Sequence, residues 1–288
     1  MSLLKKTLLA SLMTLSIAAP IAHAEITMGL IPAENTEEMI KKFEPMRVYL
    51  EKKLGEPVKV YTATDYTGVI EAMRKKRIDI AWFGPLSYVL AQQEAGAVPF
   101  AVGIRKGADS HTYKSIFVAK CDSGIKNLAD LKGKDVAFVN PASTSGGLMP
   151  TYMIYKQFGV MPQDYFGKFT YAGSHDAAEL AVANGTVSAA ADNDITYEKM
   201  VKKGQIDPKV SCVIAESTPL PGSPLVYRGD LNPEMQKKIR DAILNAHNEI
   251  QVSGYGELSH YAPVDAADYQ IVRDMIKELK LSKEEMLK

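Results

Sequence analysis

Three hydroxyl side chains stand together near the middle of the chain, directly before an expected helix. Ser143, Thr144 and Ser145 precede two glycines and a run in which Leu148 and later apolar residues recur on one helix face, with no lysine or arginine nearby. A helix N-terminus offers unpaired N–H groups and the positive end of a dipole, and hydroxyls add donors that suit a tetrahedral oxyanion. Glycine lets the backbone come close to the anion. An ordinary helix cap needs only one Ser or Thr, so we favour an anion site over a cap.

Two further segments repeat this arrangement on a smaller scale. Tyr66 follows Thr64 and Asp65 at the start of an expected helix, and His175 follows Ser174 at a strand-to-helix turn. Ligands in open α/β sheets bind at such turns. Core packing of Tyr66 and a structural role for His175 are the alternatives at these two positions.

Signatures of enzymes and of metal sites are missing from the sequence. There is no G-x-x-x-x-G-K-[ST] loop and no G-x-S-x-G motif, and "STSGG" lacks the strand-elbow-helix context of a nucleophile. The histidines of the mature chain are scattered without H-E-x-x-H spacing, and the cysteines without C-x-x-C spacing. We therefore expect no metal and no cofactor, and a protein that captures an anion rather than converting it.

The first 24 residues predict a cleaved signal peptide. Lys5 and Lys6 are followed by an apolar run and by Ala22-His23-Ala24, which has the A-x-A form of a cleavage site. The apolar run is shorter than the roughly 18 residues that a membrane span needs. We expect a mature chain that starts near Glu25 and is exported to the periplasm as a soluble protein.

Charge and cysteine content narrow the class of protein further. The chain has 34 basic and 34 acidic residues, and two of the lysines lie in the predicted signal peptide. This balance argues against nucleic acid and other polyanions as partners. Cys121 and Cys212 either form a disulfide, as an oxidising compartment permits, or remain buried thiols, and the sequence leaves both open.

Short apolar β-type runs alternate with helical patterns, which predicts an α/β fold with largely parallel sheets. We expect a helix that starts near 174 or 175 to turn Ala177, Leu180 and Ala181 inward. Strands are expected at residues 26–32, 58–63, 78–84, 100–104, 113–119, 135–140, 169–173, 211–216 and 224–228, and further helices at about 45–54, 66–75, 232–250 and 266–280.

No Pro/Gly/Ser-rich linker separates a first half of the chain from a second. The stretch 119–222 instead has the pattern of a self-contained α/β unit inserted into the rest. This predicts two lobes between which the chain crosses twice, with the crossing segments as a hinge. We place lobe 1 at residues 25–118 with 224–288, and lobe 2 at 119–223.

Four segments resemble a known family. The chain is similar to the PhnD-type phosphonate/phosphite family of periplasmic solute-binding proteins from about Ile26 to its end, in "DYTGVIEAMRKKRIDIAWFGPLSYVLAQ", "NPASTSGGLMPTYMIY", "YAGSHDAAELAVANG" and "PLPGSPLVYRGDL". The resemblance implies a two-lobed Venus-flytrap fold of type II with the ligand in the cleft. It also implies a monomer that delivers its ligand to the inner-membrane permease of an ABC importer. The ligand-binding residues that it implies are Tyr66, Tyr113, Ser143, Thr144, Ser145 and His175.

Departures from the family pattern bear on the ligand. Family members that bind aminoalkyl phosphonates place carboxylates around the ammonium group, whereas Ile195 and Ser223 occupy those positions here. Asp192 and Asp194 lie close in sequence and are possible substitutes. Since an unpaired buried ammonium costs several kcal/mol, we expect a ligand without an amine, such as phosphite, methylphosphonate or hypophosphite.

The residues Trp82 and Phe83 are expected either to wall off the non-oxygen side of the ligand or to pack in the core. The pocket inferred in this way contains no lysine or arginine. The alternatives are a receptor for 2-aminoethylphosphonate or for sulfonate or sulfate, a sensor that hands its closed form to a signalling receptor, and a periplasmic enzyme that acts on phosphorus esters.

Overall fold

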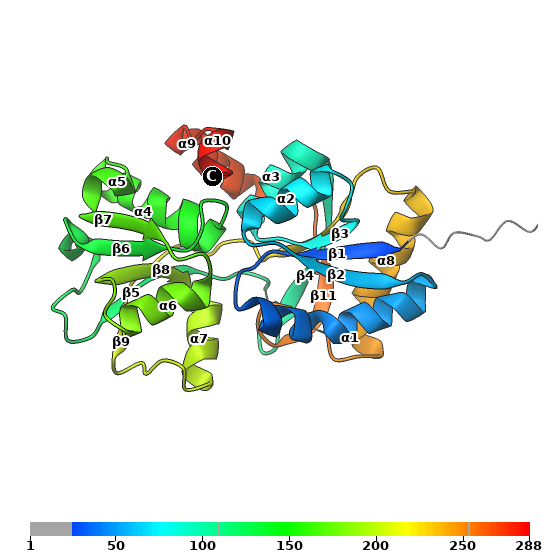
Figure 1. Ribbon diagram of the computed structural model, residues 1–288, viewed down its shortest axis with the longest axis horizontal. Coiled ribbons are helices and arrows are strands. Elements are labelled where there is room, and N and C mark those ends of the chain that lie inside the picture. Colours follow the sequence, from blue (N-terminus) through cyan, green and yellow to red (C-terminus); the bar gives the residue numbers. More distant parts are fainter. Residues whose placement is uncertain (1–24, 109, 253) are drawn as a thin grey trace, which may run out of the picture.

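The computed structural model describes residues 25–108, 110–252 and 254–288. The predicted signal peptide, residues 1–24, lies outside the described residues. Two lobes lie side by side, each built on its own β-sheet with helices packed against it (Figure 1). This arrangement confirms the predicted two-lobed α/β fold.

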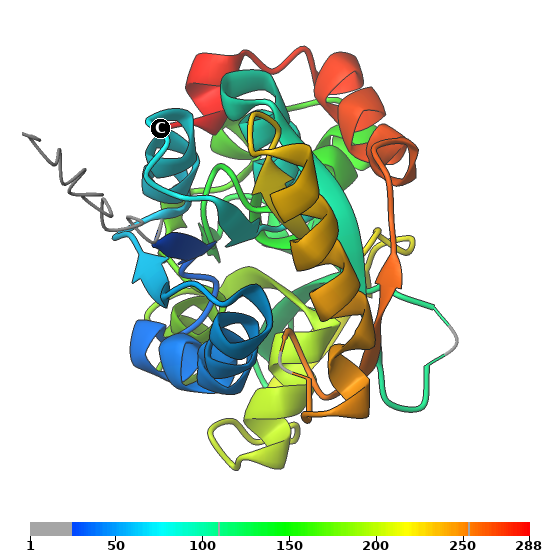
Figure 2. The same ribbon diagram turned by 90° about the vertical axis from the view of Figure 1, so that its right-hand side faces the viewer.

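The sheet of lobe 1 has the strand order β11-β4-β10-β3-β1-β2. In Figure 2, which views the molecule end on, α8 runs along this sheet beside β4 and β11. The strands of lobe 1 are β1 (Ile26–Leu30), β2 (Val58–Thr62), β3 (Ile80–Trp82), β4 (Ala97–Arg105), β10 (Pro224–Arg228) and β11 (Leu258–Pro263). Its helices are α1 (Thr36–Leu54), α2 (Tyr66–Arg74), α3 (Pro85–Ala95), α8 (Pro233–Asn245), η3 (Ala246–Asn248), η4 (Ala267–Tyr269), α9 (Gln270–Leu279) and α10 (Lys283–Met286).

The sheet of lobe 2 has the strand order β7-β6-β8-β5-β9. Its strands are β5 (Ser115–Lys120), β6 (Asp135–Phe138), β7 (Lys168–Tyr171), β8 (Ala189–Asn193) and β9 (Ser211–Glu216). Its helices are η1 (Leu128–Leu131), the π-helical turn η2 (Thr144–Leu148), α4 (Met149–Phe158), α5 (Pro162–Tyr165), α6 (His175–Ala183) and α7 (Asp194–Lys202).

Both sheets are mixed, so the expectation of largely parallel sheets was wrong. In lobe 1 only β1 pairs in parallel fashion, with β2 and with β3, and in lobe 2 only β6 does, with β7 and with β8. Every antiparallel pair includes β4, β5 or β10, which lie next to the crossings between the lobes; their antiparallel partners include β3, β8, β9 and β11. Two parallel neighbours in one sheet need a crossover connection between them, usually a helix. A chain that passes directly into the other lobe and back again has no such connection, so its strands pair in antiparallel fashion.

The two crossing segments pair with each other between the lobes. Tyr113 and Leu220 form an isolated antiparallel bridge, in which the N–H of Tyr113 donates to the Leu220 carbonyl at 3.1 Å and the N–H of Leu220 donates back at 2.8 Å. Strand β5 already belongs to the sheet of lobe 2 from Ser115 onward. The lobe boundaries at residues 118 and 223 stay a prediction.

Some local predictions were wrong. Helix α1 begins at Thr36, not near Pro45, because Asn35 caps it by accepting the N–H of Glu38, and Pro45 lies within the helix. Strand β8 was not predicted, since its alanines have low strand propensity and are all buried, which leaves no alternating pattern.

The buried face of α6 also differs from the prediction. Ala178 and Val182 are buried together with His175, whereas Leu180 is 39% exposed. His175 turns into the cleft, so the residues three, four and seven positions further along share its face.

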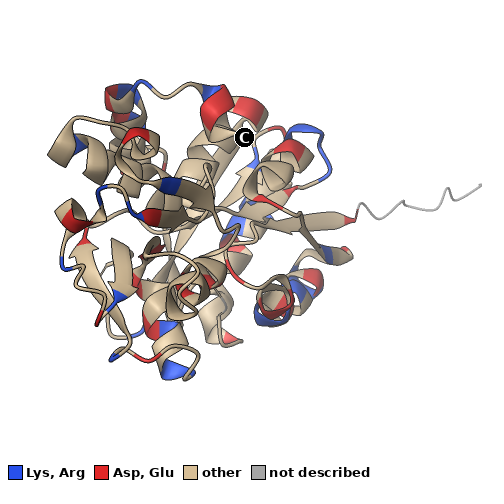
Figure 3. Ribbon diagram, turned by 60° about the vertical axis from the view of Figure 1, so that its left-hand side comes forward, with Lys and Arg blue, Asp and Glu red and all other residues tan. Residues whose placement is uncertain are grey.

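The surface carries both charges in alternation. Lys and Arg are interspersed with Asp and Glu over both lobes (Figure 3). No helix within the described residues combines the length and apolar character that crossing a membrane requires.

A disulfide joins the two cysteines, which resolves the alternative that the sequence left open. The Cys121 and Cys212 sulfurs are bonded and link the end of β5 to β9 across 91 residues. The disulfide lies at the end of β5 that is far from the crossing between the lobes. The crossing is at the other end of the strand, next to Ser115.

We expect the disulfide to stabilise lobe 2 without affecting ligand binding. Replacing both cysteines by serine should lower the free energy of unfolding by about 2–5 kcal/mol, because the open chain gains entropy when unfolded. Urea denaturation of the variant and of the wild type, with and without reductant, measures this loss. Unchanged stability in both the variant and the reduced wild type would contradict the prediction.

Candidate functional site

The residues expected to bind the ligand meet where the two lobes face each other. Tyr66 begins α2 in lobe 1, Ser143 to Ser145 lie at the start of η2 in lobe 2, and Tyr113 lies on the first crossing segment. His175 begins α6. All six of these side chains are at most 6% exposed.

The hydroxyls of Ser143 and Thr144 accept backbone N–H groups. Ser143 Oγ accepts the N–H of Gly146 at 3.1 Å and caps η2. Thr144 Oγ1 accepts the N–H of Leu86, in the first turn of α3 in the other lobe, at 2.8 Å. A hydroxyl that accepts in this way keeps its own proton, so both side chains remain donors for an anion.

The glycine pair serves the packing of η2 rather than the approach of a ligand. A Cβ at Gly146 would lie 2.2 Å from Val139 Cγ2, and one at Gly147 would lie 2.4 Å from the Asn140 carbonyl oxygen. Any side chain at these positions would push η2 away from the end of β6. The interpretation of these glycines as giving access to the anion is therefore replaced by a packing role.

Two tyrosines add neutral donors. Burial raises the pKa of Tyr66, an effect that the nearby Ser143 hydroxyl reduces, and the Tyr66 hydroxyl has no hydrogen-bond partner among the described residues. Burial likewise raises the pKa of Tyr113, which lies near Ser145 and Thr144. Both phenols therefore keep their protons at neutral pH and can only donate to an anion.

The imidazole of His175, at the start of α6, lies against the carboxyl group of Asp192 in β8. Its Nδ1 contacts Asp192 Oδ1, and Asn193 Nδ2 lies 2.9 Å from the same nitrogen. Burial lowers the pKa of His175 to about 4, although Glu34 and other acidic groups oppose the effect. The imidazole of the empty site is therefore neutral near pH 7. Its backbone N–H donates to the Ala33 carbonyl of lobe 1 at 2.9 Å.

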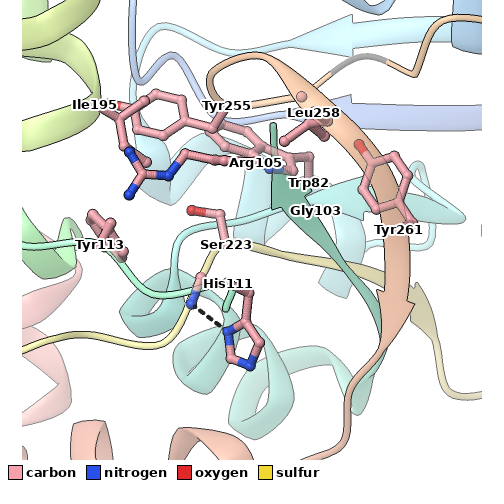
Figure 4. A pocket seen from close by; sticks show the side chains of 12 residues that line it. Trp82, Gly103, Arg105, His111, Tyr113, Ile195, Ser223, Tyr255, Leu258 and Tyr261 are labelled. Atoms are coloured by element: carbon pink, nitrogen blue, oxygen red, sulfur yellow. Dashed lines mark hydrogen bonds between the residues drawn. The ribbon is translucent and has the colours of Figure 1, made fainter. Parts of the chain in front are cut away.

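A cavity opens beside Tyr113, between the crossing segments and the loop before β11 (Figure 4). Trp82 forms part of its wall and packs against Tyr255, with ring centroids 5.4 Å apart. Phe83 is fully buried in the core and does not line the cavity. The described lining residues are Trp82, Gly103, Arg105, His111, Tyr113, Ile195, Gly222, Ser223, Gly254, Tyr255, Leu258 and Tyr261.

The two aspartates expected as substitutes for the missing acids do not line this cavity. Asp192 is fully buried behind His175. Asp194 begins α7, accepts the N–H of Lys114 at 3.0 Å and lies 3.8 Å from Arg105. Arg105 lines the cavity, and of the six expected ligand-binding residues only Tyr113 lines it with Arg105. The expectation of a ligand pocket without lysine or arginine stays a prediction.

Ion pairs between the lobes hold the cleft closed. Lys199 of α7 lies 2.6 Å from Glu34, whose side chain is 2% exposed, and Lys42 lies 3.3 Å from the same carboxylate. Burial alone raises the pKa of Glu34, but the two ammonium groups outweigh burial and hold it below its ordinary value. Lys203 and Glu38 form a second, more exposed pair at 2.7 Å.

Sequence reasoning missed several residues of this region. Tyr255 stands between two glycines in a loop, a signal that the sequence carried. Its hydroxyl lies 2.7 Å from Asn193 Nδ2 and contacts Thr196. Arg105 and Lys199 carried no local signal, since only the closed arrangement of the lobes gives them their partners.

Two lobes that close over buried neutral donors at a hinge define a solute-binding protein. No group of three His, Cys, Asp or Glu residues in the described part of the chain is placed to hold a metal ion. The comparisons with known proteins identify the family.

A family model described as "ABC transporter, phosphonate, periplasmic substrate-binding protein" matches residues 28–269. The chain is 34% identical over 284 residues to the phosphonates-binding periplasmic protein of Escherichia coli K12, covering 95% of this chain and 82% of that protein. It is 34% identical over 224 residues to the phosphate-import protein PhnD of Mycolicibacterium smegmatis, covering 75% of this chain and 70% of that one.

Among solved structures, the binding-protein component of an ABC phosphonate transporter from Pseudomonas aeruginosa has a TM-score of 0.79 and 28% identity, covering 92% of this chain and 88% of that one. The chain therefore belongs to the periplasmic substrate-binding proteins of phosphonate ABC transporters.

We expect the buried ion pair to contribute more to closure than the exposed one. Lys199→Met should weaken ligand binding by about tenfold, because Glu34 then stays buried with one ammonium instead of two. Lys203→Met, which breaks the exposed pair with Glu38, is the matched control and should change affinity by less than about threefold.

Trp82 is the only tryptophan of the chain and lines the cavity, so its fluorescence can follow titration with the tightest-binding anion of the panel described below. Equal losses in the two variants would show that closure does not depend on the burial of Glu34.

Proposed function

We propose that this protein captures a small phosphorus oxyanion without an amine, such as phosphite, methylphosphonate or hypophosphite, and delivers it to the permease of an ABC importer. The observation that carries the proposal is the lining of the cavity beside Tyr113. Among its described residues there is no Asp or Glu, and Arg105 is present. Ile195 and Ser223, where amine-binding relatives would have acids, both line it.

Charge disfavours an ammonium in this cavity. Removing a charged amine from water without a partner costs several kcal/mol. Arg105 places a positive charge at the cavity, which Asp194 and Glu198, each 3.8 Å from the guanidinium, reduce without lining the cavity themselves. Asp194, which precedes the lining residue Ile195 in the sequence, lies 3.8 Å from the Arg105 guanidinium. Its carboxylate is therefore not a free partner for an ammonium.

Size favours a ligand with a very small substituent. The closed cavity has a volume of about 20 Å³. A water molecule needs about 10–15 Å³ on the same measure, so a volume of this size favours a hydrogen atom or a methyl group over an aminoethyl chain.

Neutral donors supply the affinity for the oxyanion. Tyr66, Ser143, Thr144 and His175 each keep a proton that can be donated, and each lies at or beside the start of a helix, where the dipole favours an anion. A hydrogen bond to a charged group contributes roughly 1.5–3 kcal/mol, so four to six of them reach micromolar affinity, about −8 kcal/mol, after ordering costs.

Calorimetric titration of the mature protein tests the proposal. The panel is phosphite, methylphosphonate, hypophosphite, 2-aminoethylphosphonate, phosphate and sulfate. We expect an amine-free phosphorus anion to bind most tightly. Preferred binding of 2-aminoethylphosphonate, phosphate or sulfate would replace the proposed ligand class, and turnover of a phosphorus ester would show an enzyme. The same sample, analysed by light scattering, tests our proposal that the protein is a monomer.

We expect a single carboxylate at Ser223 to change the ligand preference. Ser223→Asp should weaken methylphosphonate binding by about tenfold or more, roughly 1.4 kcal/mol, through repulsion of the anion. It should also raise the affinity for 2-aminoethylphosphonate relative to the wild type. Ser223→Asn has the same shape without the charge and is the control. If Asn and Asp give the same affinities, the charge of the cavity does not set the preference.

A further inference from the structure

A pair of buried carboxyl groups behind His175 has no role in the site described above. Glu179 lies one turn after His175 in α6 and is fully buried, as is Asp192 in β8. Neither oxygen of Glu179 has a hydrogen-bond partner among the described residues, and Oδ2 of Asp192 has none either. A buried, unpaired carboxylate is costly, so these groups need a partner that ionised carboxylates cannot supply.

Protonation provides that partner. Two carboxylates are acceptors only and cannot bond to each other, whereas a carboxylic acid donates to its neighbour. Burial raises the pKa of Glu179 well above its ordinary range, and the charge of Asp192 raises it further. Burial also raises the pKa of Asp192 well above its ordinary range. Burial therefore favours the protonated acid at both positions, although hydrogen bonds from Glu179 and from the Asn193 backbone oppose the effect at Asp192.

The orientation of Asn193 determines which nitrogen of His175 carries the proton. Asn193 Oδ1 accepts the N–H of Thr196 at 2.9 Å, so its amino group must face His175 Nδ1, at 2.9 Å. Asp192 Oδ1 contacts the same nitrogen. The Asn193 amino group also lies 2.7 Å from the Tyr255 hydroxyl, 3.1 Å from Asp192 Oδ1 and 3.3 Å from Thr196 Oγ1. We assign its two hydrogens to the two nearest acceptors, Tyr255 and His175 Nδ1, which makes Nδ1 an acceptor and leaves the proton on Nε2.

The ring is also placed toward the anion site. A Cβ at Gly146 would lie 3.3 Å from His175 Cε1, so the ring edge between its two nitrogens lies against η2, next to Ser143. Nε2 has no hydrogen bond to any described residue, which leaves its N–H available for a ligand.

We propose that Glu179, Asp192 and His175 form a chain of proton donors that ends at the bound anion. Glu179 donates to Asp192 Oδ2, Asp192 Oδ1 donates to His175 Nδ1, and His175 Nε2 donates to an oxygen of the ligand. When the anion binds, the Asp192 O–H bond breaks and an N–H bond forms at Nδ1, so the ligand faces an imidazolium that the empty site does not have. The Asp192 carboxylate that remains accepts a hydrogen bond from Glu179, which keeps its proton.

Other charged groups around the chain are arranged to permit this transfer. Glu34, before α1, and Asp176, in α6, add negative charge near His175, and Lys199 of α7 adds positive charge. The Tyr255 hydroxyl faces Asn193 from lobe 1. Glu34 is itself paired with two lysines, so an imidazolium at His175 is balanced by the Asp192 carboxylate behind it and by the anion in front.

This inference rests on the proposed function, because it requires an anion at His175 Nε2. Hypophosphite is the probe, since it carries one charge throughout the working pH range and cannot itself take up or release a proton near neutrality. Ring nitrogen signals of ¹⁵N-histidine-labelled protein report the protonation state of His175 before and after saturation, with the His175→Gln variant providing the assignment.

In the empty protein we expect a neutral ring protonated at Nε2, and with hypophosphite a ring protonated at both nitrogens. The Asp192→Asn variant should bind hypophosphite about tenfold more weakly, with a neutral ring in both states, because an amide has no proton to transfer. Glu179→Gln keeps a donor to Asp192 and should bind within about threefold of the wild type, whereas Glu179→Leu should lose about tenfold or more.

Thermal unfolding of all variants identifies any that fail to fold. A His175 that is already an imidazolium in the empty protein, or that carries its proton on Nδ1, would overturn the chain whether or not a ligand binds. Hypophosphite binding with a ring that stays neutral would overturn the transfer while leaving the proposed function intact. If no anion of the panel binds the wild type, the proposed function and the ligand-driven transfer both fail, and the spectrum of the empty protein still decides the tautomer.

Discussion

Burying a small anion between two lobes, as a phosphonate-binding protein must, is the constraint on which the rest of this structure depends. An anion that leaves water needs a donor for almost every lone pair, and donors on flexible surface side chains would not hold a single geometry. Here the donors that we propose stand at helix starts, Tyr66 on α2, Ser143 beside η2 and His175 on α6, and each start follows a strand of the sheet in its lobe. Two lobes are needed because one lobe cannot surround the anion.

The burial of Glu34 belongs to the same constraint. Lys199 reaches Glu34 from the other lobe, so the pair exists only when the cleft is closed. Arg105 is placed in a similar way, near Asp194 and at the edge of the cavity. These fixed charges therefore pair between the lobes, around the neutral side chains that we propose as donors to the ligand.

The two-lobed fold and the start of each site helix could be predicted from the sequence because their signals are local. A serine that caps a helix, as Ser143 does, shows itself within a few residues. Strand β8 could not be predicted, because its alanines are buried on both faces of the strand and so show no alternation of polar and apolar residues. Glu179 was missed for a related reason: the inward face of α6 is set by His175 turning into the cleft, and only that orientation reveals a buried acid at the fourth position after it.

If the crossing segments act as the hinge and Tyr113 binds the ligand, as we expect from the sequence, the bridge between Tyr113 and Leu220 gives the hinge and the site one shared residue. A point on a rotation axis moves least when two bodies turn about it, so the Tyr113 side chain keeps nearly the same position whether the cleft is open or shut. An arriving ion can therefore meet Tyr113 in its final geometry before any other donor from the opposite lobe is in reach. The backbone thereby sets the order in which donors contact the ion, from the rotation axis outward. Release of the ion to a membrane partner would break these contacts in the reverse order.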